Sequence, residues 1–331
     1  MQHRQSSPRI PVPASLAAAP FSVREGTRAG LGRQRLLGRD LHRPFAGARV
    51  TPGDPTLSLQ QLCAAYQARS PTSHFFSHVT AARLWDAPLP LAAEGEAHVH
   101  VSCNRPGAVP RARGVVGHLL ADPQLRVTGL RGLRLCDPAT TWCQLESLLD
   151  FGDLVAVGDF FVLERERMGT HSGPERRALV PIGELRRRAE ERSGPGSRVL
   201  RRAAAAVRVG AESRRESLLR LLIVGHGLPE PLLNQNVFDA DGQWLGRADM
   251  LYPAQNVIVE YNGDLHRTDL HQFEHDVVRI ESFRRAGYSV VEVRSRGLTS
   301  QRHQTLERVS HALALPLRPA VASQELVLKP P

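Results

Sequence analysis

The chain has 331 residues, of which 41% are hydrophobic and 23% charged, a balance typical of a globular protein long enough for two domains. Its formal net charge is +10 and all but one of its 43 basic residues are arginine; a genomic bias explains the missing lysine better than function does, but the excess of positive charge favours a polyanionic partner such as DNA. The longest apolar run, "LLRLLIVGHGL", is interrupted by Arg220 and His226, and no cysteines form a C-x-x-C pair, so we expect a cytoplasmic protein with no membrane partner, no zinc knuckle and no small-molecule cofactor.

The N-terminal segments predict a small DNA-binding module. Residues 1–20 are rich in proline, serine and alanine and are expected to form a disordered tail. "SVREGTRAG" and "GRQRLLGRD" then predict two short helices, and "PFAGARV" predicts a strand. Helix, turn, helix and strand in so short a segment are typical of a winged helix-turn-helix. The alternative is a helical hairpin packed on the next domain.

The middle of the chain predicts an α+β region. "TLSLQQLCAAYQAR" and "SHVTAARLW" read as amphipathic helices, and residues 97–135 contain four strand-like segments. Asp137 is expected to cap a helix that runs from Pro138 to about Leu149, and "GDLVAVGDFFVLE" predicts one more helix. We interpret His78, at the start of "SHVTAARLW", as a packing residue rather than a metal ligand.

The arginine-dense stretch that follows predicts a linker. We assign residues 21–165 to one N-terminal module and interpret residues 166–211 as an arginine-rich helical linker with solvated faces. A stripe of arginines that faces DNA is the alternative.

The C-terminal part, residues 212–315, predicts elements in the order α, β, β, β, α, β, α, followed by a tail over residues 316–331. Asp-Gly in "DADGQ" is a strong hairpin signal between the first two strands. The long helix in "DLHQFEHDVVRIESFRRAG" carries Phe273, Val277, Ile280 and Phe283 on one face. Four strands with three helices predict a separate α/β domain.

Two carboxylates occupy apolar strands within "RADMLYPAQNVIVEYNG". Asp249 lies beside Met250 and Leu251, and Glu260 follows three apolar residues. Neighbouring strands lie about 4.8 Å apart, so a hairpin would bring the two side chains close enough to share one hard cation such as Mg²⁺ or Mn²⁺. The alternative is structural: Asp249 pairs with an arginine such as Arg247 or Arg279, and Glu260 lies at an exposed strand end.

This pattern of elements and acids resembles the PD-(D/E)XK nuclease superfamily, and more closely the endonuclease-like domain related to Vsr, the very-short-patch mismatch-repair endonucleases. The resemblance covers roughly residues 212–300 and rests on "LPEPLLNQNV", "RADMLYP", "VEYNGDLH" and "FEHDVVRIESFRRAGYSVVEV". It implies a restriction-endonuclease-like αβββαβ core in which Asp249 and Glu260 hold the catalytic Mg²⁺ (or Mn²⁺).

The resemblance also implies supporting residues. Glu216, on the first helix, corresponds to an extra acidic ligand or water-orienting group, with Glu212 as the fallback and a helix N-terminal charge as the alternative. Gln235 fits a recurring glutamine on the first strand, or a hydrogen bond within the sheet. Asp276 is either functional or a charge in the N-terminal turn that the helix dipole favours.

One position departs from the family pattern. The superfamily has lysine two residues after the glutamate, whereas this chain has Asn262, which cannot titrate. His266, four positions further on, is the substitute that we predict for acid–base chemistry, because its reference pKa of about 6.5 suits proton transfer near neutral pH. Capping of a helix or contact with a phosphate is the alternative role for His266.

Residues 21–165 resemble the winged-helix region and following domain of AbiEi-type antitoxins, on "FSVREGTRAGLGRQRLLGRDLHRPFAGARV" and "FSHVTAARLWDAPLP". This second resemblance implies that a helix enters the major groove of DNA. Together the two resemblances predict a metal-dependent endonuclease with a DNA-binding module. The alternative is a non-catalytic DNA-binding regulator, or antitoxin-like protein, that retains the nuclease fold.

Overall fold

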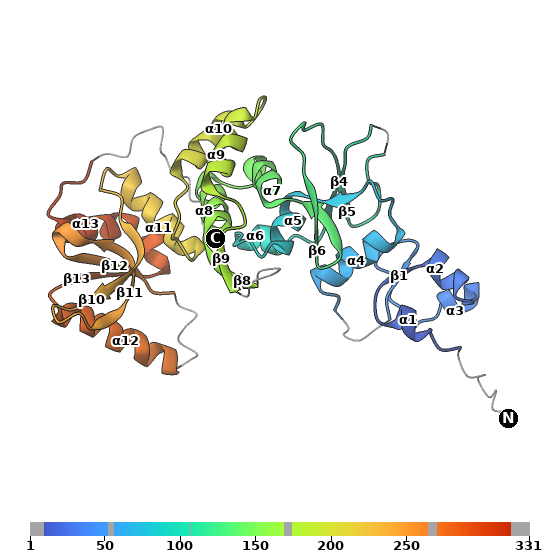
Figure 1. The fold of residues 1–331 in the computed structure, drawn as a ribbon, viewed down its shortest axis with the longest axis horizontal. Coiled ribbons are helices and arrows are strands. Elements are labelled where there is room, and N and C mark those ends of the chain that lie inside the picture. The colour runs from blue at the N-terminus through green and yellow to red at the C-terminus, as the bar shows by residue number, and fades with distance from the viewer. Residues whose placement is uncertain (1–9, 52–55, 107, 169–173, 264–269, 319–331) are drawn as a thin grey trace. The chain divides into compact units, whose positions relative to one another are not determined.

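The computed structural model describes residues 10–51, 56–106, 108–168, 174–263 and 270–318 (Figure 1). The chain forms two compact units, Met1–Asp86 with Ala92–Thr141, and Ala87–Leu91 with Trp142–Pro331. Both contain helices and sheets, so the mixed α/β class expected from the sequence is confirmed. Within the described residues, no helix is both long and apolar enough to cross a membrane.

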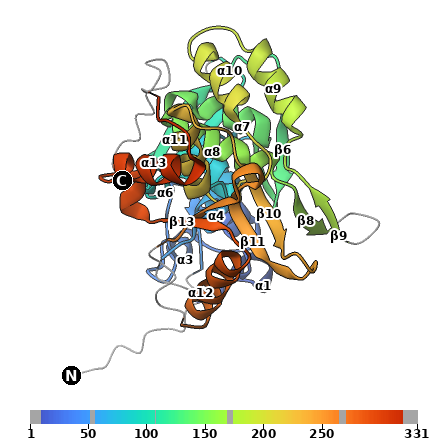
Figure 2. The same ribbon diagram turned by 90° about the vertical axis from the view of Figure 1, so that its left-hand side faces the viewer.

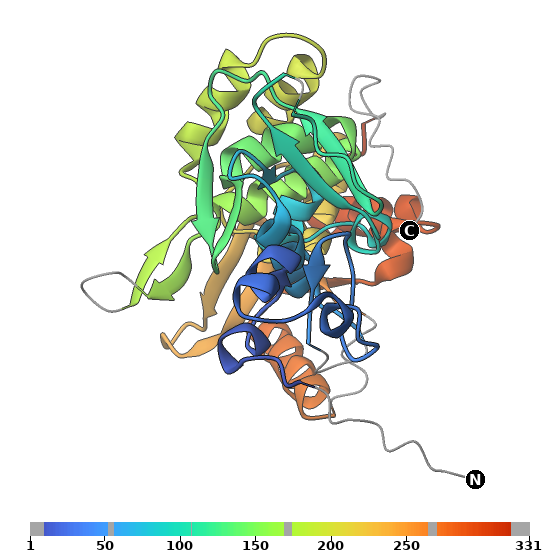
Figure 3. The ribbon, with the colours of Figure 1, turned by 90° about the vertical axis from the view of Figure 1, so that its right-hand side faces the viewer.

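Small elements begin the first unit: α1 (Ala14–Ala17), β1 (Phe21–Ser22), α2 (Val23–Arg28), α3 (Arg33–Leu36) and β2 (Ala48–Arg49). Ser22 caps α2 in a reciprocal capping box with Glu25, and β1 pairs antiparallel with β2. The predicted helix, turn, helix and strand are therefore present, and α2 and α3, in dark blue, lie together in Figure 3. The predicted tail of residues 1–20 is wrong for residues 10–20, because Leu16 packs against a core that contains Phe21 and Leu36.

A five-stranded mixed sheet forms the rest of the first unit, with the strand order β5-β4-β3-β7-β6. Its elements are α4 (Leu59–Arg69), β3 (Phe75–Phe76), α5 (His78–Leu84), α6 (Leu91–Glu94), β4 (Val99–Cys103), β5 (Val115–Leu119), β6 (Val127–Leu130) and β7 (Leu133–Cys136). Strand β4 is buried along its whole length, with Val99 and Val101 in the apolar core. The alternate residues of β4, His100 and Ser102, therefore lie on the opposite face.

The second unit begins with elements that the sequence did not fully predict. The boundary between the units falls within α7 (Pro138–Gln144). After it come a 3₁₀ turn (Leu145–Ser147), α8 (Phe151–Val162), β8 (Arg165–Met168), β9 (Pro174–Arg177), α9 (Ile182–Glu191) and α10 (Ser197–Ala206). Asp137 does cap α7, since its carboxylate accepts the Thr140 N–H at 2.8 Å.

The interpretation of residues 166–211 as a helical linker is corrected in two respects. Strands β8 and β9 pair antiparallel and lie side by side in Figure 2. Helices α9 and α10 pack against each other, α10 also contacts α8, and Leu185 and Leu200 are fully buried. The density of arginine obscured an apolar stripe at helical spacing, so this segment is part of a packed unit.

The C-terminal elements follow the predicted order: α11 (Arg214–Gly225), β10 (Leu232–Phe238), β11 (Trp244–Tyr252), β12 (Val257–Tyr261), α12 (Leu270–Arg285), β13 (Ser289–Val293) and α13 (Arg302–Leu313). Short 3₁₀ turns lie at Pro253–Gln255 and Ser295–Leu298. The sheet order is β10-β11-β12-β13, with β12 and β13 parallel and the other pairs antiparallel. The predicted tail beyond residue 315 begins ordered, because Leu317 packs against the core.

Helices cover both faces of this sheet (Figures 1 and 2). Helices α11 and α13 pack on the face that carries Met250 and Val259, and α12 packs on the face that carries Ile258. From the predicted apolar stripe of α12, Ile280 and Phe283 are buried, whereas Val277 is 40% exposed. The α12 face of the sheet therefore has a smaller apolar core, and it is the face on which Glu260 and Glu292 lie.

Candidate functional site

The hydrogen-bonded ladder between β11 and β12 ends where the two predicted carboxylates begin. Regular pairing runs from Tyr252 opposite Val257 to Met250 opposite Val259. At the next position, side-chain carboxylates accept the hydrogen bonds of the backbone N–H groups: Glu260 accepts the Asp249 N–H at 3.2 Å, and Asp249 accepts the Tyr261 N–H at 2.8 Å. The strands thus bring both acids together, as the sequence predicted, at a place where backbone donors still need acceptors.

Glu260 is nearly inaccessible and is paired with an arginine from α12. Its side chain is 1% exposed, and its second carboxylate oxygen lies 2.8 Å from Nη1 of Arg279. Arg279 also donates to the Arg247 carbonyl at 2.7 Å. The alternative of an exposed strand end is therefore wrong for Glu260, and the arginine foreseen as a partner of Asp249 pairs with Glu260 instead.

Glu216 approaches from the N-terminal end of α11. It is 8% exposed, and its carboxylate accepts the Asn234 side-chain amide at 2.7 Å and the Glu212 N–H at 2.9 Å. Asn234 has a left-handed backbone with φ of 50° inside β10, a conformation that is uncommon for a non-glycine residue. Glu216 thus lies at the N-terminal end of its helix, as the alternative interpretation expected, and it also lies near Asp249.

The pKa values show how crowded with negative charge this region is. Burial raises the pKa of Asp249 well above its usual range, and the charges of Glu260 and Glu216 raise it further. Burial also raises the pKa of Glu260, although Arg279 opposes that shift. The Arg279 guanidinium therefore interacts with three acids, Glu260, Asp249 and Asp276. Glu216 adds a further negative charge beside Asp249.

Asn262, two residues after Glu260, contacts a further acid. Asn262 donates its amide to Glu292 at 2.9 Å, and Glu292 pairs with Arg284 at 2.7 Å. Glu292 lies beside Glu260 in the parallel register of β12 and β13, so it is a further acid on the same face, one that sequence reasoning missed. The only sequence signal for Glu292 was its place near the end of the strand predicted in "YSVVEVRS".

Of the remaining predicted residues, some lie near Asp249 and Glu260 and others do not. Asp276 lies beyond the first turn of α12 and contacts Arg279 at 3.3 Å, so the dipole explanation is wrong and Asp276 belongs to the same charge cluster. Gln235 is exposed and donates to the Leu233 carbonyl at 2.7 Å, which is the sheet contact given as its alternative. Glu212 pairs with Arg247 at 2.7 Å, and His266 lies outside the described residues.

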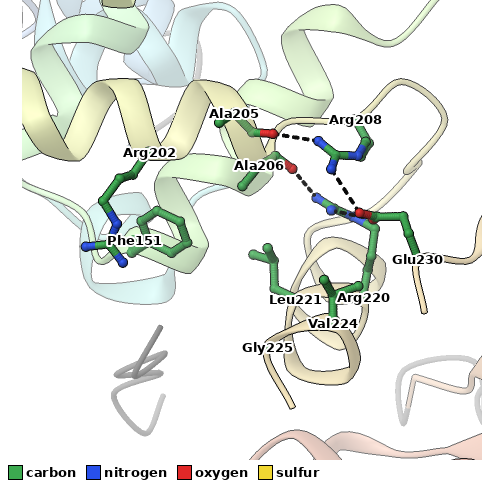
Figure 4. A pocket seen from close by; sticks show the side chains of 10 residues that line it. All are labelled: Phe151, Arg202, Ala205, Ala206, Arg208, Arg220, Leu221, Val224, Gly225 and Glu230. Atoms are coloured by element: carbon green, nitrogen blue, oxygen red, sulfur yellow. Dashed lines mark hydrogen bonds and ion pairs between the residues drawn. The ribbon is translucent and has the colours of Figure 1, made fainter. Parts of the chain in front are cut away.

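A pocket of about 290 Å³ in the same unit has no acid of this group in its lining (Figure 4). Its walls come from α8, α10 and α11, and Arg208 and Arg220 converge on Glu230 at 2.9 Å each. Arg220 also pairs with the fully buried Asp159 at 3.0 Å. The polar side chains of this pocket are thus already engaged with one another.

A third polar cluster, in the first unit, was not expected. Among the described residues, the only three potential ligands with donor atoms all within 4.8 Å of one another are those of His78, His100 and His118. Burial, then the neighbouring imidazoles, lowers the pKa of His78 to about 3 and that of His118 to about 4. His78 does begin a helix, as predicted, but its ring stacks on His118 with centroids 3.8 Å apart. The histidines of "AHVHVS" and "VVGHLL" were the available signal.

Searches with this chain found no matching family model, no matching curated protein and no matching solved structure.

Proposed function

We propose that the second unit is a metal-dependent endonuclease, with the αβββαβ core of the PD-(D/E)XK superfamily and closest in type to Vsr-related domains. The observation that carries this proposal is the pair Asp249 and Glu260, which meet where β11 and β12 stop pairing, in a region where acids outnumber arginines. Acids held this close raise the free energy of the metal-free fold, and a bound cation relieves that repulsion.

The donor set fits Mg²⁺ or Mn²⁺. Carboxylate oxygens are the ligands that hard cations prefer, and Mg²⁺ commonly uses only one or two protein carboxylates and keeps several waters. Asp249 and Glu260 would hold the ion, with Glu216 within electrostatic reach. When bound, the ion supplies Lewis-acid stabilisation of a phosphoryl oxygen and lowers the pKa of a water.

Arg279 supplies the positive charge that Asn262 lacks. Its guanidinium lies against Glu260, comes from a helix rather than from the strand, and is partly exposed at 23%. A guanidinium matches the geometry of phosphate, so Arg279 is suited to bind the scissile phosphate when that phosphate competes with Glu260 for the guanidinium. In this proposal Arg279 stabilises charge, and Asn262 positions β12 through Glu292.

The first unit contributes DNA binding in this proposal. The β1, α2, α3 and β2 elements suit a small winged helix-turn-helix of the AbiEi-like type, with α3 as the helix that faces the groove. Helix α3 has only four residues, so phosphate contacts from its exposed arginine, Arg33, carry more of the binding than base readout does. Arg35 pairs with Asp40 at 2.8 Å.

A second function is favoured by one observation. Asn262 replaces the usual lysine and its amide is engaged with Glu292 at 2.9 Å. A chain that binds DNA without cleaving it, as a regulator or antitoxin-like protein, would retain the acids and the fold while lacking that lysine.

Cleavage of supercoiled plasmid separates the two functions. With Mg²⁺ or Mn²⁺ the wild-type protein is expected to produce nicked circles, and Asp249→Ala and Glu260→Ala are each expected to produce none while melting cooperatively. Asp241→Asn, an exposed acid in the β10–β11 turn, is the matched control and should cleave as wild type does. DNA binding without cleavage by the wild-type protein would support the regulator instead.

A further inference from the structure

We infer that His78, His100 and His118 form a binding site for a transition-metal ion of the zinc class in the first unit. One ring nitrogen from each histidine lies within 4.8 Å of the other two. This site is separate in sequence and in chemistry from the carboxylates of the proposed nuclease, and it does not depend on that proposal.

The sheet register brings two of the three rings together. His118 on β5 lies opposite Ser102 on β4, and His100 lies two residues before Ser102 on the same face. His78 begins α5, its ring centroid lies 5.8 Å from that of His100, and the His100 N–H donates to Thr80 of that helix at 2.8 Å. Three elements thus converge on one polar patch, behind a strand whose other face is in the apolar core.

The nitrogen geometry suits a tetrahedral metal. Nδ1 of His100 and Nε2 of His118 lie 3.1 Å apart. Two imidazole nitrogens about 2.05 Å from one tetrahedral Zn²⁺ would be roughly 3.3 Å apart, so His100 and His118 already have this spacing. The ring of His78, which stacks on His118 with centroids 3.8 Å apart, must turn away from that ring to direct a nitrogen at the ion. Imidazole ligands favour Zn²⁺, Cu²⁺, Ni²⁺ or Co²⁺ over Mg²⁺, which prefers oxygen.

Two further features hold the rings in place. His78 has a left-handed backbone with φ of 49°, and such strain in a non-glycine residue is concentrated at functional sites. The Ser77 hydroxyl lies 2.9 Å from Nδ1 of His78 and accepts a hydrogen bond from Ser102 at 2.6 Å, although Ser77 and Ser102 are both fully buried. Hydrogen bonds of this kind orient the histidine ligands of metal sites.

Three protein ligands leave one tetrahedral position for water or for an external ligand, an arrangement typical of zinc sites that are not purely structural. The ion would also tie α5 to β4 and to the edge strand β5. We therefore expect the metal both to stabilise the first unit and to present a position for a small anionic or nitrogen ligand.

The test is metal binding by the full-length protein after chelator treatment and buffer exchange. Calorimetric titration with Zn²⁺ is expected to give one tight site per chain, and Co²⁺ is expected to give the visible absorption of tetrahedral coordination. His118→Asn and His78→Asn should each weaken Zn²⁺ affinity at least 100-fold, whereas His303→Gln, an exposed histidine in the second unit, should leave it unchanged. Asp249→Asn should leave this Zn²⁺ site intact.

The competing explanation is a simple hydrogen bond between the rings of His100 and His118. The site would be overturned if the wild-type protein bound no Zn²⁺ when the ion was supplied in tenfold excess. It would also be overturned if the His118→Asn and His78→Asn variants folded cooperatively and bound Zn²⁺ with unchanged affinity. Zinc K-edge absorption on the wild-type complex requires no variant, and fewer than three histidine nitrogens in the first shell would overturn it equally.

Discussion

Two ion pairs are withdrawn from water within the second unit, and they differ in the charges around them. Asp159 and Arg220 are each 1% exposed and lie 3.0 Å apart, and Glu260 and Arg279 lie 2.8 Å apart at 1% and 23% exposure. Around the first pair, burial raises the pKa of Asp159 while every neighbouring charge and hydrogen bond lowers it. Around the second pair, neighbouring acids add to the effect of burial on Asp249.

The difference teaches that burial of an ion pair does not by itself indicate function. Near α8 and α11, two acids, Asp159 and Glu230, face two arginines, Arg208 and Arg220, so charge is balanced. Near β11 and β12, Arg279 interacts with Glu260, Asp249 and Asp276. Arg247 and Arg284 each pair with one further acid, so acids still outnumber arginines. We interpret the balanced network as structural and the unbalanced one as a site that a cation completes.

Breaking the balanced network should have the largest effect. Arg220→Met leaves Asp159 as an uncompensated buried charge, and we expect a loss of about 3–5 kcal/mol in the free energy of unfolding. Urea denaturation measures it. Arg285→Met removes an exposed pair with Glu281 and should change stability by less than about 0.5 kcal/mol. Equal losses in the two variants would show that the buried network has no special structural role.

Removing Arg279 from the unbalanced cluster should affect activity more than stability. Arg279→Gln is expected to lower the rate of Mg²⁺-dependent nicking by roughly 10²- to 10³-fold, the span for loss of one group that stabilises transition-state charge. Arg284→Gln, whose partner is Glu292, is the matched control. Single-turnover cleavage at saturating DNA makes the comparison, and equal rates for the two variants would remove Arg279 from the proposed mechanism.

Neutralising an acid of the cluster should stabilise the metal-free protein. Because the pKa of Asp249 is raised in the folded state, the unfolded chain loses this proton first as pH rises above about 4, and stability falls until the folded carboxyl also ionises. Asp249→Asn should therefore raise the melting temperature at pH 7 in EDTA, by roughly 2–4 °C for each kcal/mol. The gain should shrink toward pH 4, and a gain independent of pH would contradict this assignment of charge.

Rising ionic strength should weaken DNA binding gradually. If arginines of the chain contact Z phosphates, the logarithm of the DNA association constant should fall with the logarithm of salt concentration with a slope of about −0.9Z. Arg33→Gln should make the slope shallower by about one contact. Fluorescence anisotropy with a duplex measures this, and a slope equal to that of the wild type would remove α3 from the interface.

Much of the C-terminal architecture followed from local sequence signals. The Asp-Gly turn between the first two apolar strands and Gly287 at the end of the long helix predicted the element order, and hydrophobic neighbours marked Asp249 and Glu260 as unusual. The partner of Glu260 did not follow, since Arg279 comes from a helix whose docking depends on tertiary packing. The His78 cluster also needed three elements that only the sheet register brings together. In residues 166–211, charge density concealed the few apolar positions that make α9 and α10 pack.

The central claim, that the unbalanced acids form a cation site, is tested most directly by calorimetric titration of Mn²⁺ into the His118→Asn protein, in which the histidine cluster is disabled. We predict one site, lost on further substitution of Asp249 by asparagine and retained on substitution of the exposed Asp241. Absence of binding, or binding that Asp249→Asn leaves unchanged, would contradict the claim and identify Asp249 and Glu260 as structural acids.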